Sequence, residues 1–146
     1  MRYGFVSELI VIVTGSRIWN ARKVLWGALD FHEPTLVVHG AAHGADLMAE
    51  AWAKQAPCDY HAFPAKWRKQ SFNQQGTVFN SLGGFERNER MLRAYPGALV
   101  LAFPEGEARG THDCMNRAMK LGHPLIVYDN AGRIVSSTGQ PSPGLV

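Results

Sequence analysis

The chain has 146 residues, 46% hydrophobic and 18% charged, a composition typical of one globular domain around a single core. Its two cysteines form no CxxC pair, which argues against a disulfide framework or a zinc ribbon and favours a reducing, cytoplasmic environment. The net charge of +3 favours anionic partners, with nucleotides and nucleic acid both open, and no run approaches the ~18 apolar residues of a membrane span.

Apolar runs alternate with amphipathic segments along most of the chain. Residues 9–13, LIVIV, form a β-branched run that ends in Thr-Gly-Ser, which predicts a strand buried on both faces rather than a signal sequence. Residues 21–31 place their apolar side chains on one helical face, and Pro34 breaks that helix. The same reasoning predicts strands at 36–39, 60–63, 97–103 and 124–129, and helices at 44–55, 85–95 and 111–122.

Two segments depart from this alternation. Residues 64–83 have no clear period and are predicted to be a long loop insertion with room for a short helix. Residues 136–146 are rich in Ser, Pro and Gly and are expected to be a flexible tail after a single domain of residues 1–135.

The alternation of strands and helices predicts an α/β three-layer sandwich, with helices on both faces of a mostly parallel sheet of about five or six strands. Ligands of such sheets bind at the carboxyl ends of the strands, where the strand order switches. The turns expected at that edge are residues 14–17, 39–46, 63–67 and 103–111.

The first two turns carry residues that suit a phosphorylated ligand. Gly15 lets a ligand approach the backbone, Ser16 can cap a helix or bond a phosphate, and Arg17 offers a charged donor; an ordinary turn with a solvated arginine is the alternative. In the second turn, Gly40 and Gly44 lead into a helix start that suits an anion.

Asp46 follows in the first turn of that helix. It either caps the helix or accepts hydrogen bonds from a ribose. His39 and His43 straddle the turn instead of sharing a helical face, so no metal site is predicted.

Two later segments add charge and small residues. Arg87 and Asn88 open a helix after a glycine pair, where the guanidinium can clamp a phosphate or serve as surface charge. Gly106, Gly110 and Thr111 lie at the next helix start, in a loop that is neither a Walker A sequence nor the GxGxxG fingerprint.

Aromatic and basic residues gather in the 64–83 segment. Trp67 and Phe72 can stack on bases, with Lys66, Arg68 and Lys69 beside them for phosphates. A loop anchored by its own aromatic side chains is the alternative.

The ordered set VTGSR, VVHGAAHGAD, FPAKW, GGFERNERM and FPEGEARGTHD resembles the SLOG superfamily, in particular its YspA-like, cpYpsA-related branch. Members of that branch are small Rossmann-like proteins, often of bacteria and phages. The superfamily includes the LOG phosphoribohydrolases, which cleave the base from nucleoside monophosphates, the DNA-processing protein DprA, and sensors of nucleotides related to ADP-ribose. The resemblance covers residues 9–129.

The resemblance implies a nucleotide site and a homo-oligomer, and no cofactor is expected. It makes Arg87 and Asp113 the candidate catalytic residues of any hydrolysis, although Glu105 interrupts the LOG glycine pair and Cys114 stands in place of the LOG glutamate. The turns and the resemblance together make the candidate ligand-binding residues Gly15, Ser16, Arg17, Gly40, Gly44, Ala45, Asp46, Arg87, Asn88, Gly106, Gly110 and Thr111.

The leading hypothesis is therefore a protein that binds a phosphorylated ribose, such as a nucleoside monophosphate or an ADP-ribose-like molecule, as a sensor or processor of nucleotide signals. Hydrolysis of the N-glycosidic bond of such a ligand is one alternative, so whether the protein is an enzyme stays open. Binding of single-stranded nucleic acid in the manner of DprA is the other.

Overall fold

The computed structural model describes residues 8–73 and 75–138 of the chain. Strands and helices alternate over these residues as the sequence predicts, with three additional short strands. The elements are β1 (Ile10–Gly15), α1 (Arg22–His32), β2 (Leu36–His39), α2 (Ala45–Gln55), β3 (Asp59–Ala62), β4 (Arg68–Gln70), β5 (Thr77–Phe79), α3 (Gly83–Ala94), β6 (Leu99–Phe103), α4 (Arg109–Lys120), β7 (Leu125–Tyr128) and β8 (Ile134–Thr138).

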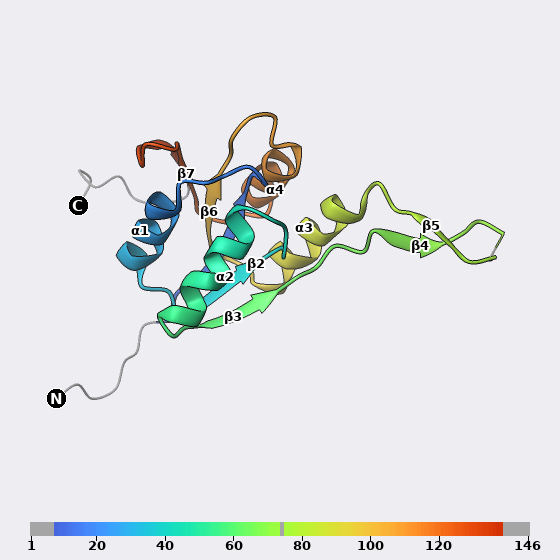
Figure 1. The fold of residues 1–146 in the computed structure, drawn as a ribbon, viewed down its shortest axis with the longest axis horizontal. Coiled ribbons are helices and arrows are strands. Elements are labelled where there is room, and N and C mark those ends of the chain that lie inside the picture. The colour runs from blue at the N-terminus through green and yellow to red at the C-terminus, as the bar shows by residue number, and fades with distance from the viewer. Residues whose placement is uncertain (1–7, 74, 139–146) are drawn as a thin grey trace.

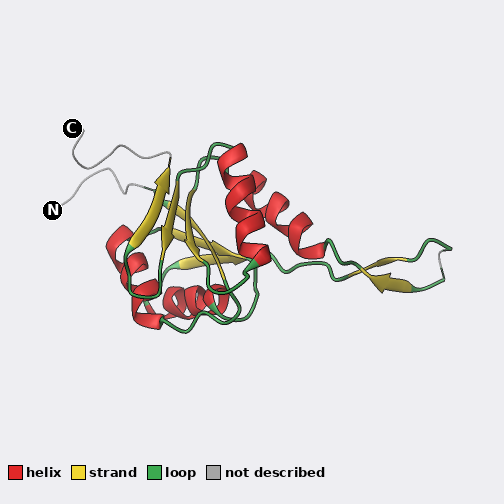
Figure 2. Ribbon diagram, turned by 90° about the horizontal axis from the view of Figure 1, so that it is seen from above, coloured by secondary structure: helices red, strands yellow, loops and turns green. Residues whose placement is uncertain are grey.

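Six strands form one sheet in the order β3-β2-β1-β6-β7-β8, and β8 alone of these six runs antiparallel to its neighbour. Helices α1 and α2 cover one face and α3 and α4 the other, which confirms the predicted Rossmann-like three-layer sandwich (Figure 1, Figure 2). The chain passes from β1 outward to β2 and β3 and then crosses to β6 on the other side of β1. The strand order therefore switches between β1 and β6.

Strand β1 lies at the centre of the sheet and is buried on both faces, as its continuous apolar run predicts. Successive side chains of a strand point to opposite faces. Val11 and Val13 accordingly pack in the core beneath α1 and α2, and Ile12 packs in the core beneath α3 and α4. This burial holds the carboxyl end of β1, and the turn that follows it, in a defined position.

The segment at 64–83 holds a β-hairpin and not the short helix that the sequence left room for. Strands β4 and β5 pair antiparallel, from Arg68 opposite Phe79 to Gln70 opposite Thr77. The hairpin projects from the body of the protein, beyond the start of α3 (Figure 1). Because it packs into neither face of the main sheet, its sequence lacks the apolar alternation that a core-facing strand shows.

The carboxyl-terminal boundary also differs from the expectation. Strand β8 pairs with β7 through Thr138, so residues 136–138 of the expected tail belong to the sheet. Residues 139–146 of that tail lie outside the described residues. No helix in the described part of the chain has the length and apolar character needed to cross a bilayer.

Candidate functional site

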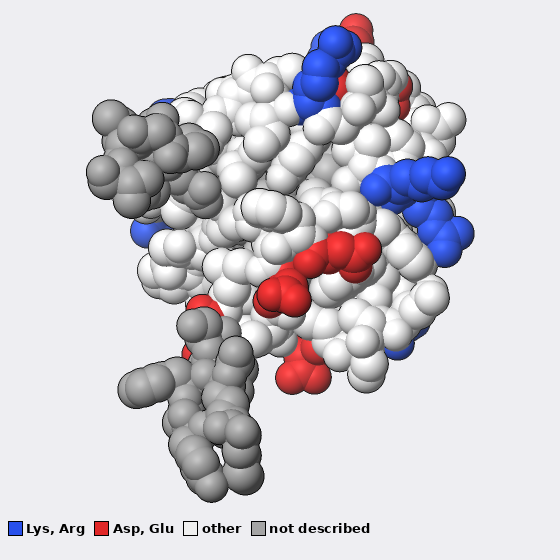
Figure 3. Space-filling model, turned by 90° about the vertical axis from the view of Figure 1, so that its left-hand side faces the viewer, with Lys and Arg blue, Asp and Glu red and all other residues white. Residues whose placement is uncertain are grey.

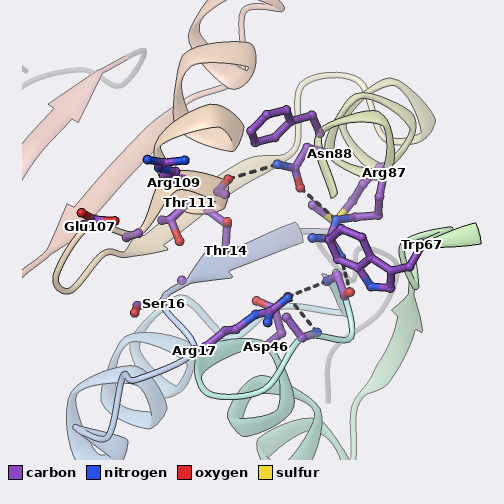
Figure 4. A pocket seen from close by; sticks show the side chains of 17 residues that line it. Thr14, Ser16, Arg17, Asp46, Trp67, Arg87, Asn88, Glu107, Arg109 and Thr111 are labelled. Atoms are coloured by element: carbon purple, nitrogen blue, oxygen red, sulfur yellow. Dashed lines mark hydrogen bonds between the residues drawn. The ribbon is translucent and has the colours of Figure 1, made fainter. Parts of the chain in front are cut away.

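A cavity of about 520 Å³ opens at the carboxyl ends of β1, β2 and β6, where the strand order switches. Ligands of open α/β sheets bind at this place. Residues from all four predicted turns line the cavity, together with the first turns of α3 (Figure 4). The lining residues are Thr14, Gly15, Ser16, Arg17, Gly40, Ala42, Asp46, Trp67, Phe85, Arg87, Asn88, Met91, Glu107, Ala108, Arg109, Gly110 and Thr111.

The N-terminus of α4 forms one side of the cavity. The helix begins at Arg109, two residues earlier than predicted, so Gly110 and Thr111 lie in its first turn. Ala108 adopts a left-handed conformation before it (φ 44°), no side chain caps the helix, and its first turn holds no acidic residue. The first backbone N–H groups of a helix lack intrahelical acceptors, and the helix dipole adds positive potential there. This side of the cavity suits an anionic group such as a phosphate.

Asp46, at the start of α2, forms the opposite wall. Its side chain is 5% exposed, and Oδ2 accepts hydrogen bonds from the backbone N–H groups of Gly40 (3.1 Å) and Ala42 (3.3 Å). Oδ1 is buried and has no hydrogen-bond partner among the described residues. Burial raises the pKa of Asp46 from 3.8 to about 6, against the opposing influence of Arg87. A buried carboxylate oxygen without a donor is costly, so this wall suits a ligand that brings hydroxyl groups.

Arg87 is held by the backbone at the ends of two strands. Its Nη1 donates to the carbonyl oxygens of Gly40 and, at 3.4 Å, Phe63, and its Nε donates to Asn88 Oδ1 at 2.9 Å. Burial lowers the pKa of Arg87, but a guanidinium stays protonated at neutral pH. Within the described residues Nη2 has no acceptor, which leaves one edge of the guanidinium for a ligand.

Asn88 joins α3 to α4. Its Nδ2 donates to the carbonyl oxygen of Gly110 at 3.1 Å and to Asp113 Oδ2 at 3.0 Å. Asp113 also accepts a hydrogen bond from Arg117 Nε at 2.8 Å, and it lines a separate hollow between α3 and α4. The candidate catalytic residue Asp113 therefore lies outside the cavity, because its helical position turns it toward Arg117.

Three predicted ligand residues, Gly44, Ala45 and Gly106, do not line the cavity. A Cβ at Gly44 would lie 2.3 Å from the carbonyl oxygen of Ser16, and a Cβ at Gly15 would lie 2.4 Å from the Cβ of Ala45. Gly44 and Ala45 thus pack α2 against the turn after β1 and do not line the cavity. Gly106 adopts φ 67° and faces Ile18, also away from the cavity lining.

The Cys114 thiol cannot take over the role of the LOG glutamate. It is fully buried in the core beneath α3 and α4, and burial raises its pKa to about 12. A thiol with this pKa stays protonated near neutral pH. It is neither a base nor a nucleophile there.

The sequence missed several side chains that the fold brings to the cavity. Arg109, Glu107 and Phe85 lie within the quoted motifs but were not singled out as ligand residues, since each sits in a loop or first helical turn whose direction depends on packing. Trp67 was identified for its chemistry, and the structure places its ring against Gly84 at the start of α3, on the cavity wall.

His39 has a structural role at the end of β2. Its Nδ1 accepts a hydrogen bond from the N–H of Ala41 (2.9 Å), so its Nε2 carries the proton that it shares with Glu50 Oε1 (3.0 Å). Burial lowers the pKa of His39, which favours this neutral form. Within residues 8–73 and 75–138, no group of three or more His, Cys, Asp or Glu residues is arranged to hold a metal ion.

Fold and cavity together define a Rossmann-like protein with a candidate ligand site at its topological switch point. The chain is similar to the Gene 61 protein of Mycobacterium phage D29, with 38% identity over 124 residues that cover 81% of this chain and 94% of the phage protein. Residues 9–70 match the YspA, cpYpsA-related SLOG family. The chain belongs to this family, whose membership points to a nucleotide-related function.

Proposed function

We propose that the cavity binds a phosphorylated ribose, as part of a nucleoside monophosphate or an ADP-ribose-like molecule. The observation that carries this proposal is the pairing of an uncapped helix start on one wall with a buried, half-satisfied carboxylate on the other. The first favours an anion, and the second favours hydroxyl donors. A ribose phosphate presents both groups in one small molecule.

The chemistry of the two walls suggests an orientation for the proposed ligand. The phosphate sits at the N–H groups of Gly110 and Thr111, with Arg109 beside them. We place the ribose hydroxyls at the carboxylate of Asp46, which lines the cavity and whose buried Oδ1 has no partner among the described residues. The reverse orientation, with the phosphate at Asp46, is disfavoured because the carboxylate and the phosphate are both anions and would repel each other.

In the proposed complex the base lies against Trp67. Its indole is 39% exposed and lines the cavity near Arg87. Any base can stack on an indole ring, since every base has a π-face. The site therefore discriminates phosphate and ribose more strongly than base identity.

Isothermal titration tests the proposal with adenosine, AMP, ribose 5-phosphate and ADP-ribose. We expect AMP to bind more tightly than adenosine, and Arg109→Ala to lower affinity for AMP about tenfold through loss of a charged contact. Arg93→Ala, which removes an exposed arginine on the far part of α3, is the matched control and should leave affinity unchanged. Absence of binding for all four ligands at high micromolar concentration would refute the proposal.

A second candidate function is hydrolysis of the N-glycosidic bond of a nucleoside monophosphate. Water adds to C1′ of the ribose, the bond from C1′ to the base breaks, and the proton from water leaves on the base. The observation that favours it is the buried Oδ1 of Asp46, which has no hydrogen-bond partner among the described residues, since oxocarbenium-like cleavage needs a carboxylate near the anomeric carbon. Release of free adenine from AMP, abolished in Asp46→Asn, is the expected result; bound AMP that stays intact over a day excludes this activity.

A further inference from the structure

The β4–β5 hairpin is the part of the molecule that the ligand cavity leaves unexplained. All six residues of its two strands are exposed, and it extends away from the sheet and its covering helices (Figure 1). An isolated two-stranded hairpin is only marginally stable in water. A projecting hairpin of this kind gains stability when a partner covers it.

The root of the hairpin is firmly attached to α3. Asn80 is 5% exposed, and its Nδ2 donates to the Lys66 carbonyl oxygen (2.9 Å) and to Glu86 Oε1 (2.7 Å). Trp67 and Phe79 stack with parallel rings, their centroids 6.0 Å apart. The hairpin is thus held at a defined place beside the cavity.

Further out, the hydrogen bonds run within the hairpin. Arg68 donates to the Thr77 side chain (3.2 Å) and carbonyl oxygen (2.8 Å), and the N–H of Ser71 donates to the Gly76 carbonyl oxygen (3.0 Å). Phe72 is fully exposed near the turn, and Phe79 is 62% exposed. These two phenylalanine side chains give the hairpin an exposed apolar surface that a binding partner would bury.

The charge of this segment is unlike that of the rest of the chain. The protein has 15 Lys and Arg against 12 Asp and Glu, and residues 60–85 hold three of the former, Lys66, Arg68 and Lys69, and none of the latter. This segment alone therefore accounts for the net charge of +3, and the remainder is balanced. Figure 3 views the protein from the end opposite the hairpin, and charges of both signs are interspersed there.

We propose that the β4–β5 hairpin is an arm that binds single-stranded nucleic acid. The three cations suit phosphates, and the exposed rings of Phe72 and Phe79 suit unpaired bases, which a duplex keeps stacked in its interior. A second copy of the chain fits less well, because two arms meeting at a twofold axis would bring their cations together without any acidic residue between them. The arm binds the strand outside the cavity, on residues that the proposed nucleotide site does not use.

Fluorescence anisotropy with labelled oligothymidylate and oligouridylate of about 20 nucleotides tests the arm, with a duplex of equal length as competitor. We expect the single strand to bind more tightly than the duplex. If all three cations contact phosphates, affinity should fall roughly twentyfold between about 50 and 200 mM salt. The DNA and RNA strands together show whether the sugar matters.

The decisive variant is Lys69→Ala with Phe72→Ala, at two exposed positions that touch neither the core nor the cavity. Its matched control is Lys23→Ala with Phe31→Ala on α1, which removes the same charge and another exposed phenylalanine ring (81% exposed). The arm variant should lose about tenfold or more in affinity for the single strand, and the control less than twofold.

Three outcomes overturn the inference. The first is no binding of the single strand at low salt, and the second is an equal loss of affinity in the arm and control variants. The third is a wild-type dimer in light scattering that becomes monomeric in the arm variant, with no nucleic-acid binding by either protein.

Titration of AMP into the arm variant separates this inference from the proposed function. Unchanged AMP affinity with lost strand binding assigns the two activities to separate surfaces. Strand binding without AMP binding would leave the arm in place and refute the nucleotide site.

Discussion

Replacing Asp46 by asparagine is expected to stabilise the protein at neutral pH while weakening its affinity for nucleotides. The asparagine has the same shape, so its oxygen can still accept the N–H groups of Gly40 and Ala42. Its amide group replaces the buried carboxylate oxygen that has no donor. The substitution thus removes a desolvated charge and keeps the local backbone bonds.

The magnitude follows from the pKa of Asp46, which burial raises from 3.8 to about 6. Because the folded value lies above the unfolded one, the stability that this carboxyl contributes is fully present below about pH 3.8 and is lost as the pH rises through about 6. The difference between the two values is equivalent to about 3 kcal/mol. The variant should therefore match the wild type near pH 4 and exceed it by up to about 3 kcal/mol above pH 7.

Urea unfolding of both proteins from about pH 4 to pH 7.5, followed by tryptophan fluorescence, measures this gap. Asp59→Asn, at an exposed position of β3, controls for the loss of one carboxylate. A variant less stable than the wild type at pH 7.5, or a gap that does not change with pH, would refute the reasoning. In the same variant, affinity for AMP should fall about ten- to a hundredfold, since a hydroxyl loses a charged acceptor.

Three further experiments test other parts of the structure. Gly44→Ala should destabilise the protein by about 2 kcal/mol or more, seen as a lower urea midpoint, because Gly44 has φ 79° and its new Cβ would meet the Ser16 carbonyl oxygen; an unchanged midpoint contradicts this contact. Of the two thiols, Cys58 should react with a disulfide reagent in the native protein and Cys114 only after unfolding, since Cys114 is fully buried. Reaction of both thiols in the native protein would contradict the burial of Cys114. Trp67→Ala should weaken binding of AMP about tenfold and leave ribose 5-phosphate unaffected, and equal losses for both ligands would place the base elsewhere.

Much of the fold could be predicted because each element carries a local periodic signal. The continuous apolar runs of β1 and β7 and the one-sided apolar faces of α1 and α2 locate those elements to within one or two residues. Strand β8 lies at an edge with four of its five residues exposed, so it lacks such a run. The signal that does mark it is the turn before it, where Asp129 Oδ1 accepts the N–H groups of Ala131 and Arg133.

The candidate site could be predicted as a set of turns but not as a set of contacts. Parallel strands bring their carboxyl ends to one edge, so the turns after β1, β2, β3 and β6 meet there by topology alone. Which side chains then face the cavity depends on the residue at which each helix begins and on how the helix is rotated about its axis. The start of α4 at Arg109 turns Thr111 inward and Asp113 toward Arg117.

The sequence by itself determined the α/β alternation, the glycine-bearing turns and the basic, aromatic composition of residues 60–85, since all three are properties of neighbouring residues. Only the tertiary structure showed that Gly44 allows two backbone segments to approach closely and that Asp46 has a buried oxygen without a donor among the described residues. It also showed that the basic segment projects from the body of the protein as a hairpin. These three depend on contacts between segments distant in the chain. Burial and hydrogen-bond satisfaction are set by such contacts and not by local periodicity.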